Sequence, residues 1–305
     1  MPYRAILCPV DFSVHARQAL RAAIGLAGRD RAELFVLSVN ELLLVEAAAA
    51  AYDAAYLRQE TESELQRLVA GVVPAHASWA PAPRLAVAVG DPSREISEFA
   101  RRERVDLVVM GTHGLGGYRK MFFGSVTQSV LRRAPAPVLA VPASGLPMVE
   151  LTDALPVFNV GRVMAPLDLS VDSDGAARSA AAVARSFSVP LLLVHIVTRV
   201  SALAPWREPL QAQLDARVAE ARDRLDRLAS GLPPEVAVSV RVEVGRPAEA
   251  IAALAAESQS GLIVMPVKAE GGPLEARPGS TAYRVLCLAQ VPVLAYCQGC
   301  QPLPA

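Results

Sequence analysis

Residues 90–110, GDPSREISEFARRERVDLVVM, return without a gap as residues 245–265, GRPAEAIAALAAESQSGLIVM. Other segments repeat in the same order at nearly the same spacing: CPVDFS (8–13) with APLDLS (165–170), LFVLSV (34–39) with LLLVHI (191–196), and 124–141 with 279–296. Internal repeats of this kind decide the fold before any single motif does. The chain of 305 residues is therefore one module written twice, which agrees with about 150 residues per domain.

Within the first copy, short apolar runs alternate with segments of helical periodicity. The apolar runs cover residues 4–10, 32–39, 84–90, 105–111 and 136–142, and the helical segments cover 14–28, 41–72, 93–104 and 125–134. Continuous apolar strands separated by helices predict a parallel sheet covered on both faces. Right-handed crossovers then give a doubly wound α/β domain in each copy.

The repeat also sets the predicted domain boundaries. The two domains are expected over residues 1–143 and 161–297, with a linker over 144–160 and a tail over 298–305. The join contains Gly145, Pro147 and Pro156 and shows weak periodicity, which is typical of a connecting segment.

Composition narrows the class of protein. Thirty basic residues balance thirty acidic ones, and no basic stripe predicts a nucleic-acid partner. The first residues, MPYRAILCPVDFS, do not have the charged and apolar regions of a signal peptide, and no apolar run is long enough to predict a membrane span. We expect a cytoplasmic protein without nucleic-acid or membrane partners.

The cysteines do not form a complete metal-binding motif. Cys8 and Cys287 lie in apolar segments and are expected to be small buried hydrophobic residues. Cys297 and Cys300 form a lone CxxC near the C-terminus, where an ordinary tail and a redox or metal role both stay open.

Glycines gather after the fourth predicted strand, in the stretch MGTHGLGGYRKMFFGSVTQ (110–128). In doubly wound sheets a ligand binds outside the carboxyl ends of the strands. Asp11 follows the first strand, and Gly111, Gly114, Gly124 and Ser125 follow the fourth. Glycines let main chain approach a ligand closely, and the start of a helix at Gly124 favours an anion. This arrangement suits a phosphate.

Structural roles compete with that interpretation. Ser125 with Gln128 matches a capping box, which stabilises a helix start without any ligand. Asp11 can cap the first helix. The chain has no P-loop, no G-x-G-x-x-G after the first strand and no recognisable hydrolase or metalloprotease motif, so we name no catalytic and no metal-binding residue.

At these residues the chain resembles the universal stress protein family, in a tandem form. The pattern G-x2-G-x9-G-S is similar to that family's ATP-binding signature, and ILCPVDFS (6–13) and SVLRRAPAPVLAVP (129–142) are typical of its first and last strands. The resemblance covers residues 1–143 in order and 161–297 more loosely. It implies a five-stranded parallel sheet in the order 3-2-1-4-5 in each domain, and ATP, with Mg²⁺, as the ligand.

The resemblance also implies roles for individual residues. Adenine and ribose would meet the first strand, the end of the second and the end of the fourth; the phosphates would meet the glycine loop and the helix that follows. The implied contacts are Pro9, Asp11, Val39, Met110 and Gly111 for adenine and ribose, and Gly114, Gly124, Ser125 and Val126 for the phosphates.

The second copy departs from this pattern. Gly111 becomes Pro266 and Gly114 becomes Ala269, while Gly124 and Ser125 survive as Gly279 and Ser280. Proline has a fixed φ and no N–H, so we expect the second site to bind ATP weakly or not at all.

The last strands of the two copies, PVLAVP (137–142) and PVLAYC (292–297), are apolar. An uncovered apolar edge strand invites pairing, and strands of this family pair between two domains. We expect the halves to pair with each other through these strands, and a homodimer is also possible. Two other functions stay open, an interaction module that binds no nucleotide and a slow ATPase.

Overall fold

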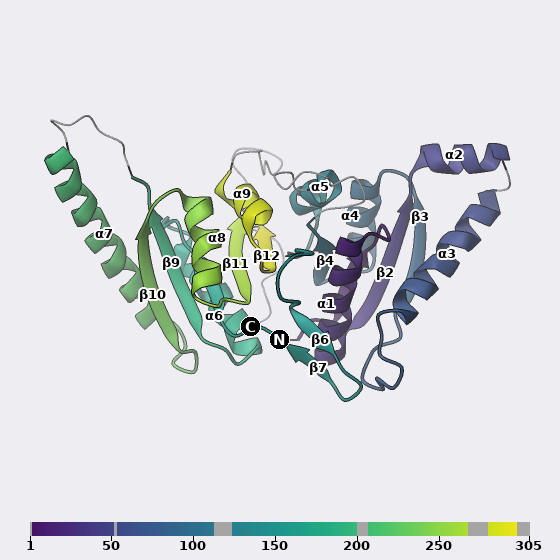
Figure 1. The fold of residues 1–305 in the computed structure, drawn as a ribbon, viewed down its shortest axis with the longest axis horizontal. Coiled ribbons are helices and arrows are strands. Elements are labelled where there is room, and N and C mark those ends of the chain that lie inside the picture. Colours follow the sequence, from purple (N-terminus) through teal and green to yellow (C-terminus); the bar gives the residue numbers. More distant parts are fainter. Residues whose placement is uncertain (1, 52–53, 113–123, 200–206, 268–279, 298–305) are drawn as a thin grey trace. The chain divides into compact units, whose positions relative to one another are not determined.

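The computed structural model describes residues 2–51, 54–112, 124–199, 207–267 and 280–297. The chain divides into two compact units, the first built mainly on Met1–Asn159 and the second on Val160–Pro266 with Arg277–Val293. Figure 1 labels the helices and strands of both.

The first unit contains the predicted doubly wound sheet. Its strands are β1 (Ala5–Pro9), β2 (Glu33–Asn40), β3 (Arg84–Val89), β4 (Leu107–Gly111) and β5 (Val138–Val141). All the pairs are parallel, in the order β3-β2-β1-β4-β5. This confirms the order 3-2-1-4-5 and makes β1 and β4 neighbours, with Ile6 opposite Leu107.

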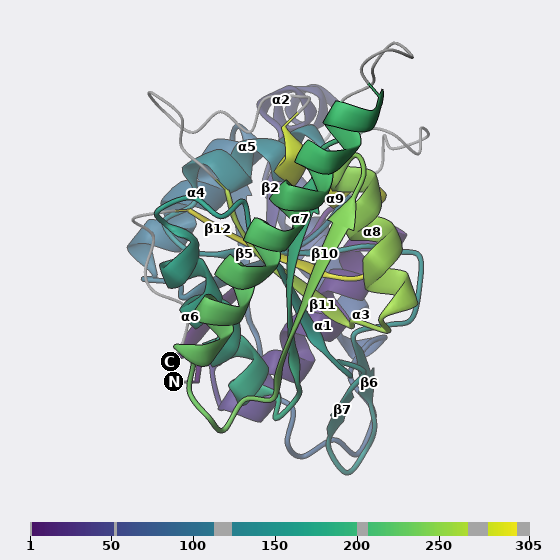
Figure 2. The ribbon, with the colours of Figure 1, turned by 90° about the vertical axis from the view of Figure 1, so that its left-hand side faces the viewer.

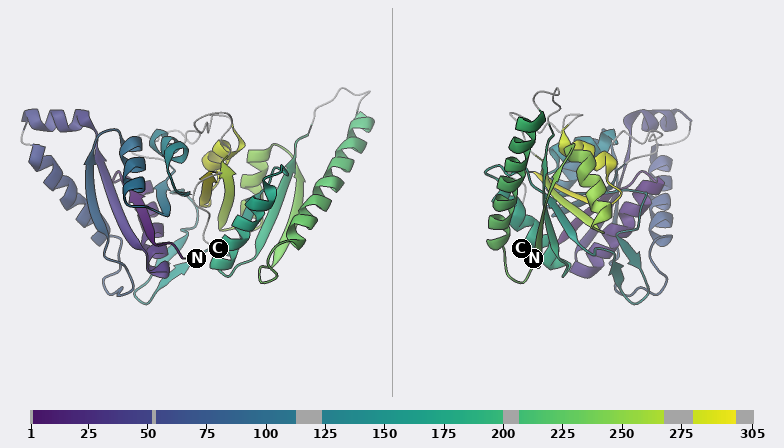
Figure 3. Two further views of the ribbon diagram at one scale, coloured as in Figure 1. Left: turned by 180° about the vertical axis from the view of Figure 1, so that it is seen from behind. Right: turned by 60° about the vertical axis from the view of Figure 1, so that its left-hand side comes forward.

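Helices cover both faces of this sheet, as Figures 1 and 3 show. On one face lie α1 (Val14–Asp30) and α3 (Ala54–Ala70), and on the other α4 (Pro92–Arg102) and α5 (Ser125–Arg133). The burial of both faces explains why β1 is buried along its whole length. Where one helix over 41–72 was predicted, the described residues form two, α2 (Leu42–Ala51) and α3.

A short hairpin occupies part of the stretch that the sequence left without a predicted element. Its strands β6 (Val149–Leu151) and β7 (Pro156–Phe158) are antiparallel and pack against α1. A Cβ on Gly25 of α1 would lie 2.8 Å from Val149 Cγ2, so the helix needs a glycine where the hairpin crosses. Trp79 anchors the turn between β6 and β7, because its Nε1 donates to the Thr152 carbonyl at 2.9 Å.

The second unit repeats the architecture. Its elements are β8 (Val163–Pro166), α6 (Ser173–Ser186), β9 (Leu191–Val197), α7 (Arg207–Ser230), β10 (Val238–Val244), α8 (Pro247–Glu257), β11 (Leu262–Val267) and α9 (Thr281–Leu288). Strand β12 (Val293–Cys297) follows α9 along the chain. The parallel strands run β10-β9-β8-β11. Figure 2 shows α7 and α6 side by side on one face.

Candidate functional site

The candidate site of the first unit lies where β1 and β4 end. Pro9 closes β1, Met110 and Gly111 close β4, and β1 pairs with both β4 and β2. Val39 lies near the end of β2 and is half-buried. The structure therefore brings these four predicted residues to one edge of the sheet, where ligands of such folds bind.

The start of α5 is tied to the end of β4. The Gly124 N–H donates to the Thr112 carbonyl at 2.9 Å, and the Thr127 hydroxyl donates to the Gly111 carbonyl at 3.0 Å. These bonds place Gly124, Ser125 and Val126 next to Gly111. Gly114 lies outside the described residues.

The first turn of α5 does not use the predicted capping box. The N-cap residue is Gly124, Ser125 is the first helical residue, and the N-cap makes no side-chain hydrogen bond. A serine inside the helix is in the wrong position for the capping box, which requires it at the N-cap. That alternative is wrong for α5.

Asp11 is also not the cap of α1. The N-cap is Ser13, whose hydroxyl accepts from the Ala16 N–H at 3.1 Å. Asp11 instead accepts from the Ser13 N–H at 3.1 Å, across Phe12, which has a left-handed backbone at φ 63°. The carboxylate is thereby held at the mouth of β1 and is half-buried.

The second unit keeps this turn. Asp168 accepts from the Ser170 N–H at 3.0 Å, and Leu169 between them has φ 58°. However, α6 begins only at Ser173, after an Asp172 N-cap that makes no side-chain bond. In the first unit the corresponding helix begins directly after the serine of the turn.

The packing of the protein explains why residue 111 is a glycine, which the sequence alone does not reveal. A Cβ at this position would lie 2.8 Å from His15 Cβ and 2.9 Å from the His15 carbonyl carbon. The glycine therefore admits the first turn of α1 against β4, whatever binds nearby. The interpretation that Gly111 makes room for a ligand is incomplete, because a close neighbour within the protein already excludes a side chain there.

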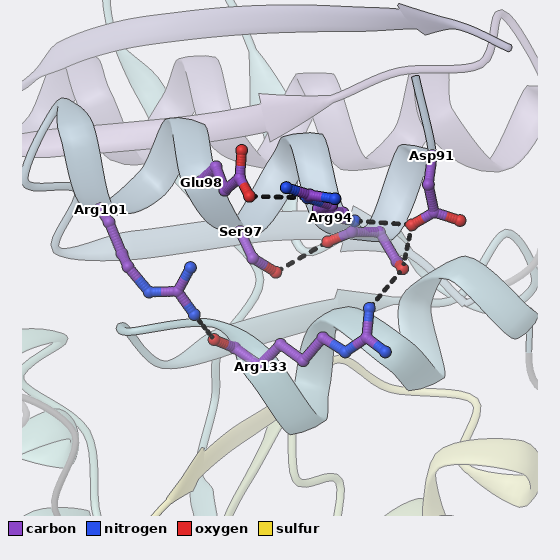
Figure 4. Close-up of polar contacts among 7 residues, drawn as sticks. Asp91, Arg94, Ser97, Glu98, Arg101 and Arg133 are labelled. Atoms are coloured by element: carbon purple, nitrogen blue, oxygen red, sulfur yellow. Dashed lines mark hydrogen bonds and ion pairs between the residues drawn. The ribbon is translucent and has the colours of Figure 1, made fainter. Parts of the chain in front are cut away.

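A polar network joins α4 to α5 (Figure 4). Asp91 is the N-cap of α4 and accepts from the Arg94 N–H at 2.8 Å and from the Ser93 hydroxyl at 2.6 Å. Arg133, at the end of α5, donates to Ser93 at 3.3 Å, and Arg101 donates to the Arg133 carbonyl at 2.9 Å.

The bonds from Ser93 and Arg94 hold the pKa of Asp91 below its ordinary value. Sequence reasoning passed over this cap, although Asp91 followed by Pro92 is a recognisable helix start. In the second unit its counterpart is Arg246, an N-cap that makes no side-chain bond.

The described part of the chain offers few groups for metal binding or thiol chemistry. No group of three or more His, Cys, Asp or Glu side chains there could hold a metal ion. Cys8 is fully buried, as predicted, and burial raises the pKa of its thiol, whereas Cys287 is only half-buried. Cys297 ends β12, and Cys300 lies outside the described residues.

No described helix combines the length and the apolar character that crossing a membrane requires.

The two units are thus tandem doubly wound α/β domains. Residues 2–142 and 159–296 each match the model of the universal stress protein family. The chain belongs to that family, as its sequence resemblance predicts.

Relatives support the assignment from both sequence and structure. Over 139 residues the chain is 30% identical to universal stress protein MJ0531 of Methanocaldococcus jannaschii (46% of this chain, 82% of the relative). It is 32% identical, also over 139 residues, to a universal stress protein of Thermus aquaticus (46% and 98%). A crystal structure of a universal stress protein from Archaeoglobus fulgidus is similar over 97% of this chain and 98% of that one, with a TM-score of 0.61 at 22% identity, which shows the shared fold.

Proposed function

We propose that this chain is a cytoplasmic stress-response protein that binds ATP in its first unit, and weakly or not at all in its second. The observation that carries the proposal is the start of α5. Its first N–H groups lie beside the end of β4, and the N-cap residue, Gly124, has no side chain that could cap them. Such groups and the positive end of the helix favour an anion. The similarity of the 111–125 pattern to the family's ATP signature selects a triphosphate.

The remaining crevice residues suit the nucleoside. Asp11, held by the Ser13 N–H, is an acceptor for ribose hydroxyl groups, and Pro9 lies at the end of the buried strand β1. Main chain at Val39 is within the last two residues of β2 and would meet the adenine edge. Gly124, Ser125 and Val126 would hold phosphate oxygens, joined by Gly114, with Met110 and Gly111 against the ribose.

Magnesium would enter with the nucleotide. Mg²⁺ usually keeps several waters and binds through substrate phosphates with one or two carboxylates. Asp11 is the one carboxylate among the described residues proposed for this site, which fits an ion carried mainly by the phosphates.

The second unit has a structural or regulatory role in this proposal. Pro266 stands at the end of β11 where β4 has Gly111, and Ser280 caps α9 with its own hydroxyl, which accepts from the Tyr283 N–H at 3.3 Å. Part of the helix start that would receive phosphate is therefore already bonded.

We also propose that the two domains pair through their last strands. Both strands are apolar in sequence, and β5 is the last strand in the order of the first unit's sheet. A cysteine pair introduced at facing positions of 138–141 and 293–296 would form an intrachain disulfide if the strands pair. Failure of every such pair to oxidise would contradict the pairing.

Two measurements test nucleotide binding. Purified protein is heat-denatured and the supernatant is analysed for released nucleotide, and emptied protein is titrated calorimetrically with ATP, ADP, AMP and cyclic AMP. We expect saturable ATP binding at one site per chain and weaker binding by a Gly114→Val variant. A protein that takes up no nucleotide would favour the interaction module, and phosphate release well above the buffer rate would favour an ATPase.

A further inference from the structure

The second unit contains a cavity that shares no residue with the ATP site proposed for the first unit. It lies between the start of α6 and the C-terminal half of α7, with a volume of about 290 Å³. Its polar lining consists of Ser170, Ser173, Asp174, Arg224 and Arg227. A volume near 300 Å³ is at the lower end of small-molecule sites, so the cavity suits a small ligand.

The charge facing this cavity is unbalanced. Arg224 donates to the Leu169 carbonyl at 2.5 Å, and Arg227 donates to the Asp223 carbonyl at 3.2 Å. Neither guanidinium forms an ion pair within the described part of the chain. The lining carboxylate, Asp174, is already paired with Arg178 at 2.8 Å. Two positive groups therefore face the cavity without a carboxylate of their own.

A buried hydroxyl points to the same conclusion. The Ser170 Oγ is buried, and no hydrogen-bond partner for it occurs among the described residues. A buried polar group without a partner costs about 1–3 kcal/mol, so a small group that accepted a hydrogen bond from this hydroxyl would recover that cost. The N-terminus of α6, with Ser173 as first helical residue, adds N–H groups on the same side.

The corresponding helix of the first unit carries a different arrangement of charges. Residues 65–72 (LQRLVAGV) correspond to 225–232 (LDRLASGL), and Leu65 and Leu225 are both fully buried. Arg67, the counterpart of Arg227, is bonded to Glu60 at 2.9 Å and to Glu64 at 2.7 Å.

The counterpart of Glu64 in the same alignment is Arg224, so a charge has been reversed. Likewise Ser13, the counterpart of Ser170, uses its hydroxyl to cap α1. In the first unit Arg67 and the Ser13 hydroxyl are bonded within the protein. In the second, Arg227 has no ion pair and the Ser170 hydroxyl has no hydrogen-bond partner among the described residues.

We propose that the second unit binds a small phosphate group, as inorganic phosphate or a phosphomonoester, in this cavity. Arg224 and Arg227 would supply charge-assisted hydrogen bonds, which are the strong kind for phosphate. Ser170 and the first N–H groups of α6 would complete the set of donors. The site is independent of the ATP site proposed for the first unit.

The test uses the full chain and sodium phosphate, titrated calorimetrically at constant ionic strength, with sodium acetate as a carboxylate comparison. Arg227→Gln is the main variant, because Arg227 is exposed and its removal leaves the fold intact. Arg222→Gln is the matched control, since Arg222 lies on the same helix but pairs with Asp226. We expect Arg227→Gln to weaken phosphate binding at least about tenfold, and Arg222→Gln to leave it unchanged. Both variants should bind ATP as the wild type does.

Ser170→Ala separates a ligand role from a structural one. It should weaken phosphate binding severalfold without lowering the free energy of unfolding, because the hydroxyl has no partner to lose. The proposal is overturned if the wild type shows no saturable phosphate binding up to about 10 mM. Equal phosphate affinity in the Arg227→Gln and Arg222→Gln proteins would overturn it too, as would acetate binding as tightly as phosphate.

Discussion

Helices α5 and α9 occupy corresponding positions in the sequences of the two units, and a Gly-Ser pair stands at the start of each, yet they begin differently. In α5 the N-cap is Gly124 and the serine is already helical, whereas in α9 the serine itself is the N-cap and bonds to the Tyr283 N–H. A shift of one residue decides whether the helix start satisfies itself or stays available to an anion. The same dipeptide therefore begins α5 without a serine cap and α9 with one.

The ends of β4 and β11 also differ between the two units. Gly111 admits the first turn of α1, while the second unit has Pro266 and a helix α6 that begins later relative to its aspartate turn. Loss of the glycine thus accompanies a change in the neighbouring helix, and the divergence involves packing as well as ligand contacts.

The largest expected effect is on that packing. Gly111→Ala would place a Cβ within 3 Å of the His15 main chain, so we expect the free energy of unfolding to fall by about 1–3 kcal/mol. Gly175→Ala in α6 is the control, because nothing lies within 4 Å of the added Cβ, and it should raise stability by about 0.5–1 kcal/mol. Urea denaturation measures both, and equal effects of the two substitutions would contradict the packing role of Gly111.

Removing the N-cap side chains of α4 and α8 should give a smaller difference in the free energy of unfolding. Asp91→Ala removes a cap that bonds to the Arg94 N–H and should cost about 0.5–2 kcal/mol. Arg246→Ala removes a side chain that makes no cap bond, and its effect should stay within about 0.5 kcal/mol.

The Asp91 contrast depends on pH. Its folded-state pKa is lowered by the bonds from Ser93 and Arg94, so its stabilisation is complete above the ordinary carboxyl pKa and disappears as the pH falls through the lowered value. The stability difference between wild type and Asp91→Ala should therefore be full at neutral pH and shrink in acid. A difference that stays constant through the acid range would rule out a role for the charge.

The smallest effect concerns the two serines. Ser280→Ala removes a helix cap and should cost about 0.5–1 kcal/mol. Ser125→Ala removes a hydroxyl that caps nothing among the described residues and should cost less than about 0.5 kcal/mol. If Ser125→Ala proved the more destabilising, the description of the α5 start would be incorrect.

Much of the fold followed from the sequence because repetition and periodicity are global signals. The parallel sheet follows from continuous apolar runs separated by helices. The strand order in the structure agrees with the order that the family resemblance implies. The β6–β7 hairpin was not predicted, because strands of three residues show no period. Their position depends on Gly25 and on contacts with α1 that are distant in sequence.

The candidate site was predicted less completely. Asp11 and Gly111 follow from where strands end, whereas Pro9 and Met110 come from the family resemblance. The pairing of β1 with β4 then brings these strand ends together. Asp11 and Ser13 are both good N-caps, and only the left-handed Phe12 between them decides that the serine caps α1. The close approach of His15 to Gly111 depends on three-dimensional packing, for which the sequence carries no local signal.

The most direct test of the central claim compares one substitution made in both halves. Gly124 has φ −55° and ψ 131°, which valine adopts without strain, so Gly124→Val should fold while its side chain obstructs the start of α5. Calorimetric titration of ATP should show binding weakened at least about tenfold by Gly124→Val and unchanged by Gly279→Val. A folded Gly124→Val protein that binds ATP as tightly as the wild type would contradict the account.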